Sequence, residues 1–153
     1  GTTHSMYKEA IQSLSDHNYL IPSYKIVTED LTNIKTLLDK NQFNIHETNN
    51  FKLYQSDVGL LYTQLVNQSP PPFNKVTRKG LLENYIAVTL EANGYPIVFW
   101  ESDSMAKVDF LIKKREEIIP IEAFVGKNTR SKSVSVLKQN NVKYVPYYAT
   151  FCI

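Results

Sequence analysis

The sequence predicts an α/β domain in which helices pack against a mixed sheet. Three observations predict this class. After residue 78 the patterns indicate a helix, three strands, a second helix and a last strand; the first of these helices has a broad apolar face; and two acidic residues stand alone inside apolar strands. Helices and short strands in this order favour a mixed sheet with helices packed against it.

The N-terminal segment has a helical pattern followed by two short extended runs. A helix ending near Asn18 is predicted by apolar residues at helical spacing, namely Tyr7, Ala10, Ile11 and Leu14. Tyr19–Ile21 and Tyr24–Val27 then predict two strands around Pro22. This order is that of the last helix and wing of a winged-helix unit. A helix and strand that merely pack on the main domain would give the same pattern.

The middle of the chain has weaker signals. Residues 28–50 are polar, with one short helical pattern formed by Leu31, Ile34, Leu37 and Leu38, and residues 41–50 are rich in Asn and typical of an exposed loop. Phe51–Tyr54 predicts a strand, and Asp57 is a suitable N-cap for a helix carrying Leu60, Leu61 and Leu65. Residues 67–74, with three consecutive prolines, indicate a linker or an ordered crossover.

The signals are clearest after that proline segment. A helix is predicted over Lys79–Asn93 by the apolar residues Leu81, Leu82, Tyr85, Ile86, Val88 and Leu90. Gly94 is placed to end it in the left-handed conformation. The elements expected after it are strands over Ile97–Trp100, Val108–Ile112 and Ile118–Val125, a charged turn over Lys113–Glu117, a helix over Ser131–Asn140 and a strand over Val142–Tyr148.

Three acidic residues are candidates for chemistry. Asp109 and Glu122 interrupt apolar strands, where an unpaired carboxylate costs several kcal/mol unless a partner or a metal compensates it. On adjacent antiparallel strands they could bind a divalent cation together, or each could be ion-paired or lie at a solvated sheet edge. Glu83 lies in the first turns of the predicted helix, where a Glu is often only a favourable partner of the helix dipole.

Several runs together resemble a known region. They are the run from Gly80 to Ile86, Phe99-Trp100-Glu101-Ser102, the run from Ala106 to Ile112, and the run from Ile118 to Ser133. They are similar to the C-terminal domain of unknown function of prokaryotic AAA-type ATP-binding proteins, which belongs to the PD-(D/E)xK restriction-endonuclease-like superfamily. Upstream, Phe51–Leu61 and Ala10–Ile21 resemble the strand and turn and the winged-helix-like segment that precede it there.

The resemblance implies a site and its loss. Glu83, Asp109 and Glu122 would be the acidic positions that hold Mg²⁺ and orient a water for attack on a phosphodiester. The catalytic lysine of the superfamily would follow Glu122 by two residues, where this chain has Phe124. Lys107 shares strand parity with Asp109 and could be a relocated lysine. Residues that could contact phosphate follow the third strand, namely Lys127 and Arg130.

The expected organisation is a winged-helix-like remnant with a connecting segment over residues 6–50, and a nuclease-like α/β domain with a mixed sheet over residues 51–153. The expected function is a non-catalytic domain of an AAA-type ATPase that binds nucleic acid or protein, or regulates the ATPase. The alternatives are an active Mg²⁺-dependent nuclease with a relocated lysine and a structural oligomerisation domain. Mg²⁺ is the one cofactor that the resemblance implies.

Composition limits these functions further. Residues 75–153 carry twelve Lys and Arg against eight Asp and Glu, a weak excess that suits either a polyanion partner or an ordinary solvated surface. The chain has one cysteine, Cys152, and no Gly-x-x-x-x-Gly-Lys-Ser/Thr loop, so it offers no internal disulfide and no P-loop for ATP. No apolar run approaches a membrane span, and we expect a cytoplasmic location.

Overall fold

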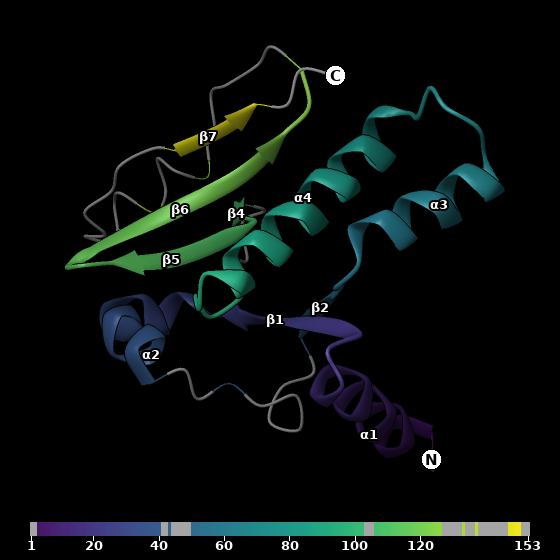
Figure 1. The fold of residues 1–153 in the computed structure, drawn as a ribbon. Coiled ribbons are helices and arrows are strands. Elements are labelled where there is room, and N and C mark those ends of the chain that lie inside the picture. Colours follow the sequence, from purple (N-terminus) through teal and green to yellow (C-terminus); the bar gives the residue numbers. More distant parts are fainter. Residues whose placement is uncertain are drawn as a thin grey trace.

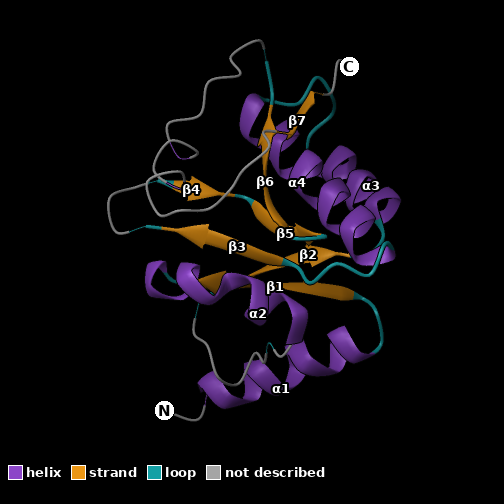
Figure 2. Ribbon diagram, turned by 90° about the vertical axis from the view of Figure 1, so that its left-hand side faces the viewer, coloured by secondary structure: helices purple, strands orange, loops and turns teal. Residues whose placement is uncertain are grey.

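The computed structural model describes residues 3–40, 43, 50–102, 106–126, 133, 137 and 147–150, with side chains described except at 3–6, 28–30 and 147–150. The fold is mixed α/β, as predicted, with a four-stranded sheet in the order β2-β1-β3-β4 and a three-stranded sheet in the order β5-β6-β7. Figure 1 shows α4 running across the strands, and Figure 2 shows that α2 and α4 lie on opposite sides of them.

The N-terminal helix is followed by one strand. Helix α1 spans Thr3–Asp16 and strand β1 spans Leu20–Ile26, so the expected pair of short strands around Pro22 is wrong. Strand β1 lies between β2 (Phe51–Gln55, antiparallel) and β3 (Val98–Glu101, parallel). Pro22 is tolerated because pairing with β3 begins only at Tyr24, beyond the missing N–H.

This pairing also shows how the N-terminal segment joins the rest of the described chain. A wing would form a hairpin of its own, whereas β1 is a central strand of the larger sheet. Strand β1 therefore belongs to the same sheet as β2 and β3, and the winged-helix-like character of the segment stays a prediction. A division of the chain at residue 50 stays a prediction, and the strand pairing of β1 with β2 and β3 crosses it.

Three further helical segments follow the sequence patterns. A 3₁₀ segment over Thr28–Asn33 leads into α2, Ile34–Lys40, and the apolar residues of that pattern are buried at Leu31, Ile34 and Leu38. Helix α3 spans Val58–Gln68, and the predicted N-cap is confirmed because the carboxylate of Asp57 accepts the N–H of Leu60 at 2.8 Å.

Helix α4 spans Lys75–Ala92 and begins four residues earlier than predicted. Its N-cap is Asn74, whose side-chain oxygen accepts the N–H of Thr77 at 2.9 Å. At the other end Gly94 has φ +75, which confirms the predicted left-handed residue after the helix.

The strand expected over Val108–Ile112 is two strands. Strand β4, Lys107–Val108, pairs with β3, and β5, Phe110–Lys114, pairs with β6, Glu117–Phe124. Asp109 lies between them, where the chain passes from one sheet to the other. The last strand, β7, spans Tyr147–Thr150 and is parallel to β6, later than expected. Of the helix expected over Ser131–Asn140, only Ser133 and Leu137 are among the described residues.

The apolar residues form two clusters on opposite faces of the strands. One packs α2 against the sheet and includes Ile34, Leu38 and Trp100. The other packs α4 against the sheet and includes Leu82, Ile86 and Phe110. Since apolar burial stabilises by about 25 cal/mol per Å², both faces of the strands contribute to holding α2 and α4 in place. The polar site described next lies on the α4 face.

Candidate functional site

Asp109 is the buried acid of the site. Its side chain is 4% exposed, and its Oδ2 accepts the backbone N–H of Ala123, on β6, at 2.9 Å. The ammonium of Lys79 lies 3.4 Å from each carboxylate oxygen, and that of Lys52 lies 3.9 Å from Oδ1. The carboxylate therefore has two cations and a backbone donor in place of the water that burial removes.

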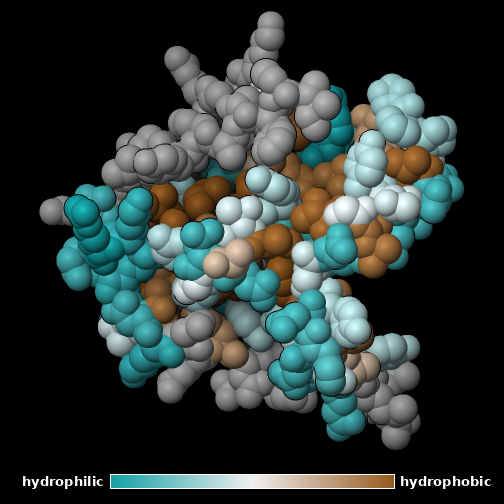
Figure 3. All heavy atoms as spheres, viewed as in Figure 1, coloured by the Kyte–Doolittle hydropathy of each residue, from teal (hydrophilic) through white to brown (hydrophobic). Residues whose placement is uncertain are grey.

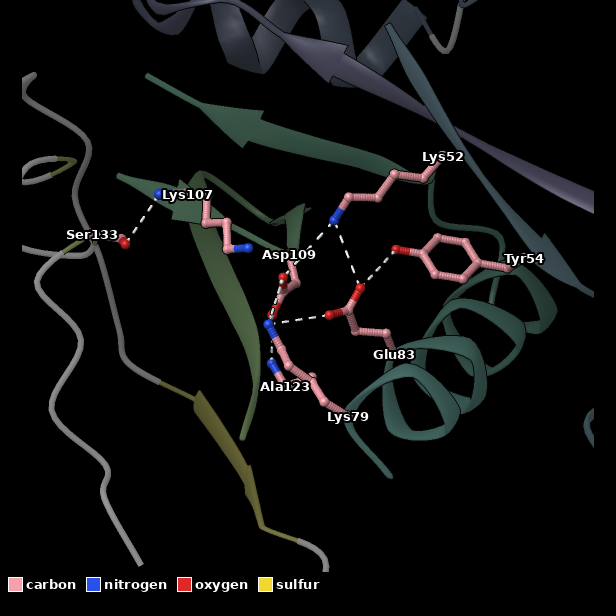
Figure 4. Close-up of polar contacts among 8 residues, drawn as sticks. All are labelled: Lys52, Tyr54, Lys79, Glu83, Lys107, Asp109, Ala123 and Ser133. Atoms are coloured by element: carbon pink, nitrogen blue, oxygen red, sulfur yellow. Dashed lines mark hydrogen bonds and ion pairs between the residues drawn. The ribbon is translucent and has the colours of Figure 1, made fainter. Parts of the chain in front are cut away.

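Glu83 is the second acid and shares the same two lysines. Its Oε1 lies 3.2 Å from the ammonium of Lys79, and its Oε2 lies 3.7 Å from that of Lys52. The hydroxyl of Tyr54 donates a hydrogen bond to Oε2 at 3.4 Å. Figure 4 shows these side chains converging from α4, β2 and the β4–β5 junction.

Local geometry explains how the lysines reach the acids. Lys79 and Glu83 are four residues apart on α4 and therefore lie on one face of the helix. Lys52 and Tyr54 are two residues apart on β2, so their side chains point to the same side of the strand. The Lys52 ammonium also lies 4.7 Å from the centre of the Phe99 ring, a cation–π contact.

One buried amide holds β2 against α4 beside these residues. The side chain of Asn84 accepts the backbone N–H of Gln55 and donates to its carbonyl oxygen, both at 2.7 Å. Gln55 is on the edge strand of the larger sheet, so Asn84 takes the place of a neighbouring strand at that position. The strand that carries Lys52 and Tyr54 is thus fixed to the helix that carries Lys79 and Glu83.

The site is electrically balanced, with two lysines and two acids that ion-pair with one another. Burial lowers the pKa of Lys79, but the charges of Asp109 and Glu83 outweigh it, and the net pKa of Lys79 is raised. Burial and the two carboxylates together raise the pKa of Tyr54 far above its ordinary value. Both groups therefore stay protonated at neutral pH, as an ammonium and a phenol.

Two of the three predicted acids, Glu83 and Asp109, share the same ion-pair partners. Glu83 and Asp109 share Lys52 and Lys79, while Glu122 lies on β6 next to Ala123, the residue that donates to Asp109. Within the described part of the chain, no group of three or more His, Cys, Asp and Glu side chains is arranged to hold a metal ion. A metal site formed by Glu83, Asp109 and Glu122 stays a prediction from the resemblance.

The other residues singled out in the sequence lie around this cluster or outside the description. Lys107 is exposed on β4, and its backbone N–H donates to the Ser133 hydroxyl at 3.1 Å (Figure 4). Phe124 ends β6, two residues after Glu122 on the same strand. The two residues predicted to contact phosphate, Lys127 and Arg130, lie outside the described residues.

Sequence reasoning missed the cations of the site. The sequence pattern marks Lys79 only as the start of a helix, and it assigns no role in a site to Lys52 or Tyr54. A signal was nevertheless present, since Lys52 is a lone charge in an apolar strand, the same feature that marked Asp109. A lone charge of either sign in an apolar strand therefore marks a candidate site residue, and Lys52 is one.

The charged cluster does not line either of two hollows on the described surface. One, of about 390 Å³, lies beside the turn that contains Lys113 and Arg115, and the other, of about 700 Å³, lies between α1 and α3. Among the described helices, none has the length and apolar character needed to cross a lipid bilayer.

Comparison with known proteins adds one match. Residues 78–150 match a family described as a domain of unknown function (DUF4143). The matched segment contains Lys79, Glu83 and Asp109, whereas Lys52 and Tyr54 precede it. No curated protein and no solved structure gives a significant match to the chain.

Proposed function

We propose that the chain is a nuclease-like domain, attached to an AAA-type ATPase, that binds nucleic acid without cleaving it. One observation carries the proposal: Glu83 and Asp109 are each ion-paired with both Lys52 and Lys79. The acids that would serve metal-dependent hydrolysis are thus already compensated by the protein's own cations.

Metal-dependent cleavage of a phosphodiester needs carboxylate oxygens that are free to bind Mg²⁺ and a cation that is free to stabilise the transition state. In this chain a divalent cation would have to displace two ammonium groups from Glu83 and Asp109. Phe124, at the position of the superfamily lysine, offers neither a positive charge nor a hydrogen-bond donor. The ion-paired acids and Phe124 both favour a site that keeps a nuclease-like arrangement but has no catalytic activity.

The excess of positive charge in the second half of the chain supports the binding of a polyanion such as nucleic acid. Residues 75–153 carry four more Lys and Arg than Asp and Glu, twelve against eight. That count already includes Lys79, Glu83 and Asp109, so the positive excess comes from residues outside the balanced charge cluster. Contacts of this kind are sequence-independent and weaken steeply with salt.

A second candidate function, an active nuclease with a relocated lysine, is favoured by the distances between the lysine ammonium groups and the two acids. An ammonium within 3.2–3.9 Å of the acids is where a relocated catalytic lysine would lie, and Lys79 and Lys52 meet this description. An active nuclease of this kind would use one of them, or Lys107, in place of the missing lysine. It differs from the proposed binding domain in turnover and in the binding of a divalent cation by the acids.

The test measures binding and cleavage on the same samples. Fluorescein-labelled single- and double-stranded DNA and RNA are titrated with the chain over a salt series, and then incubated with Mg²⁺ or Mn²⁺. The variants are Lys79→Ala, Lys107→Ala, Glu122→Ala and Phe124→Lys. Lys35→Ala is the matched control, because Lys35 pairs with Glu116 on the exposed surface.

We expect salt-dependent binding by the wild-type chain, no cleavage, and no effect of Lys35→Ala. Cleavage that Glu122→Ala abolishes, and that Lys79→Ala or Lys107→Ala also abolishes, would replace the binding domain with the relocated-lysine enzyme. Absence of both binding and cleavage for every nucleic acid would overturn the proposed partner class.

A further inference from the structure

The smaller of the two hollows, of about 390 Å³, lies where the β5–β6 turn, α2 and the end of α4 meet; we call it the turn hollow. Figure 1 shows these three elements at one end of the molecule, and Figure 3, in the same view, shows hydrophilic residues gathered there. Ligand sites are usually concave, with apolar walls and a few placed polar groups. The residues that line the turn hollow are of both kinds, namely Leu38, Asp39, Gly94, Tyr95, Pro96, Lys113 and Arg115.

Arg115 has a backbone conformation that suits another type of residue. Its φ is +57, in the left-handed region that few residues other than Gly and Asn adopt. It follows Lys114, which pairs with Glu117 across a two-residue turn, and such turns favour Gly or Asn where φ is positive. The turn itself therefore gives no reason for an Arg at this position. Local strain of this kind is commonest at sites that bind a ligand.

The guanidinium of Arg115 has no ion pair or hydrogen bond within the described part of the chain. The two acids beside it are held by other cations. Asp39 pairs with Lys113 at 2.5 Å, and Glu116 pairs with Lys35 at 3.3 Å. Two cations against one acid leave the lining of the turn hollow with one net positive charge, and Arg115 is its unpaired cation. The hollow therefore suits a ligand with one anionic group.

The rest of the lining is apolar or aromatic. Leu38 is buried, and Tyr95 is half-buried against the core beneath α4. Gly94 adds no side chain, and a Cβ built there would have no atom within 4 Å, so the hollow is open at that point. An aromatic residue beside a cation is the combination that single-stranded nucleic acids use, because the base stacks on the ring and the phosphate meets the cation.

We propose that the turn hollow binds one unstacked nucleotide of a single-stranded nucleic acid, with its phosphate at Arg115 and its base against Tyr95. This inference rests on the proposed function and narrows it from nucleic acid to single strands. A base that is stacked and paired inside a duplex cannot enter a hollow, whereas a base of a single strand can. The cation and the ring together therefore favour single strands of either DNA or RNA.

A structural role for Arg115 is the alternative. Gly94 and Tyr95 directly follow α4, and a cation near the C-terminal end of a helix is stabilised by the helix dipole. In that case the loss of Arg115 would destabilise the fold. A ligand-binding Arg in a left-handed position predicts the opposite, because Gly adopts this conformation without strain. Measured stability therefore separates the two roles.

Fluorescence anisotropy tests the proposal with labelled oligothymidylate and oligouridylate of about 15 nucleotides and with a duplex of the same length, all at one salt concentration. The variants are Arg115→Gly and Tyr95→Leu, which remove the cation and the ring. Lys114→Ala is the control for Arg115→Gly, because Lys114 is exposed in the same turn and does not line the hollow. Tyr7→Leu is the control for Tyr95→Leu, because Tyr7 is an exposed tyrosine on α1. Circular dichroism melts of each variant measure stability.

We expect at least one of the two single strands to bind more tightly than the duplex. Arg115→Gly and Tyr95→Leu should each weaken that binding at least about fivefold, and their controls by less than about twofold. The melting temperature of Arg115→Gly should equal or exceed that of the wild-type chain. If Tyr95→Leu does not fold, Arg115→Gly alone decides.

Three results would overturn the inference and leave the proposed function in place. One is a duplex that binds as tightly as both single strands. Another is a loss of binding in Lys114→Ala as large as that in Arg115→Gly, which would indicate a diffuse charge effect. The third is a lower melting temperature of Arg115→Gly with unchanged binding, which would establish the structural role at the end of α4. Absence of binding to all three nucleic acids would overturn the proposed function itself, and this inference with it.

Discussion

The ammonium of Lys79 lies 3.4 Å from Oδ2 of Asp109, a residue 30 positions further along the chain. The contact joins helix α4 to the point where the chain leaves one sheet for the other. Because the Asp109 side chain is almost fully buried, its charge depends on the cations that α4 and β2 bring to it. The cluster formed by Lys52, Lys79, Glu83 and Asp109 therefore links α4 and β2 to the β4–β5 junction, in addition to being a candidate site.

Replacing Lys79 should destabilise the fold. Lys79→Met removes one of the two cations of Asp109, and we expect the free energy of unfolding to fall by roughly 1–3 kcal/mol, since a buried charge loses a partner. Lys35→Met, which breaks the exposed pair with Glu116, should cost less than about 1 kcal/mol. Urea denaturation of the two variants measures both. Equal losses would mean that Asp109 does not rely on Lys79.

Replacing Asn84 should destabilise the fold more than replacing Asn93, the exposed C-cap residue of α4. Asn84→Ala removes both hydrogen bonds to Gln55 and leaves a buried space beside β2, so we expect a loss of roughly 1–3 kcal/mol. Asn93→Ala removes a single exposed bond to the Thr89 carbonyl and should cost at most about 1 kcal/mol. Amide hydrogen exchange should also show faster exchange at Gln55 in Asn84→Ala. Unchanged exchange there would contradict the role given to Asn84.

Ser23 should be replaceable without loss. Its side chain is fully buried on β1, and its hydroxyl has no hydrogen-bond partner among the described residues. Since an unpaired buried hydroxyl carries a desolvation cost, Ser23→Ala should leave stability unchanged or raise it by up to about 1 kcal/mol. Thermal unfolding monitored by circular dichroism measures the change. A clear loss of stability would show that the hydroxyl has a partner in solution.

The cluster should also make the fold sensitive to alkaline pH. The folded-state pKa values of Lys79 and Tyr54 are raised above their ordinary values of 10.5 and 10.0. A raised pKa means that the folded state holds its proton more tightly, so this stabilisation is complete below the ordinary pKa and is lost as pH rises through the folded value. We expect the free energy of unfolding to fall progressively as pH rises above about 10.

Variants separate the cluster from other groups that titrate in this range. The double variant Lys79→Met with Tyr54→Phe should show a flatter dependence of unfolding free energy on pH. Tyr7→Phe, which alters an exposed tyrosine on α1, should keep the slope of the wild-type chain. The same slope in the double variant as in the wild type would exclude these two groups as its cause.

The elements that could be predicted from sequence are those set by local residues. The Asp57 cap, the Gly94 turn and the helix through Leu82 and Ile86 each depend on side chains within a few positions. The division of the strand at Asp109 could not be predicted, because an apolar run looks the same whether it pairs with one sheet or two. The place of β1 between β2 and β3 depends on pairing with residues far along the chain.

The sequence marks the acids of the site more clearly than it marks the lysines. Asp109 is conspicuous in an apolar run, and the resemblance assigned roles to Glu83 and Glu122. The lysines carry no such assignment, and a Lys at the start of a helix or on an edge strand is common on surfaces. Only the packing of β2 on α4, held by Asn84, brings Lys52 to Glu83.

A crystal structure of the chain soaked in Mn²⁺ tests the central claim most directly, namely that Glu83 and Asp109 are occupied by the protein's own lysines. We expect the ammonium groups of Lys52 and Lys79 to remain in contact with both carboxylates, with no Mn²⁺ between the acids. A Mn²⁺ ion coordinated by Asp109 together with Glu83 or Glu122, with Lys79 displaced toward solvent, would contradict the account and restore a metal-dependent nuclease.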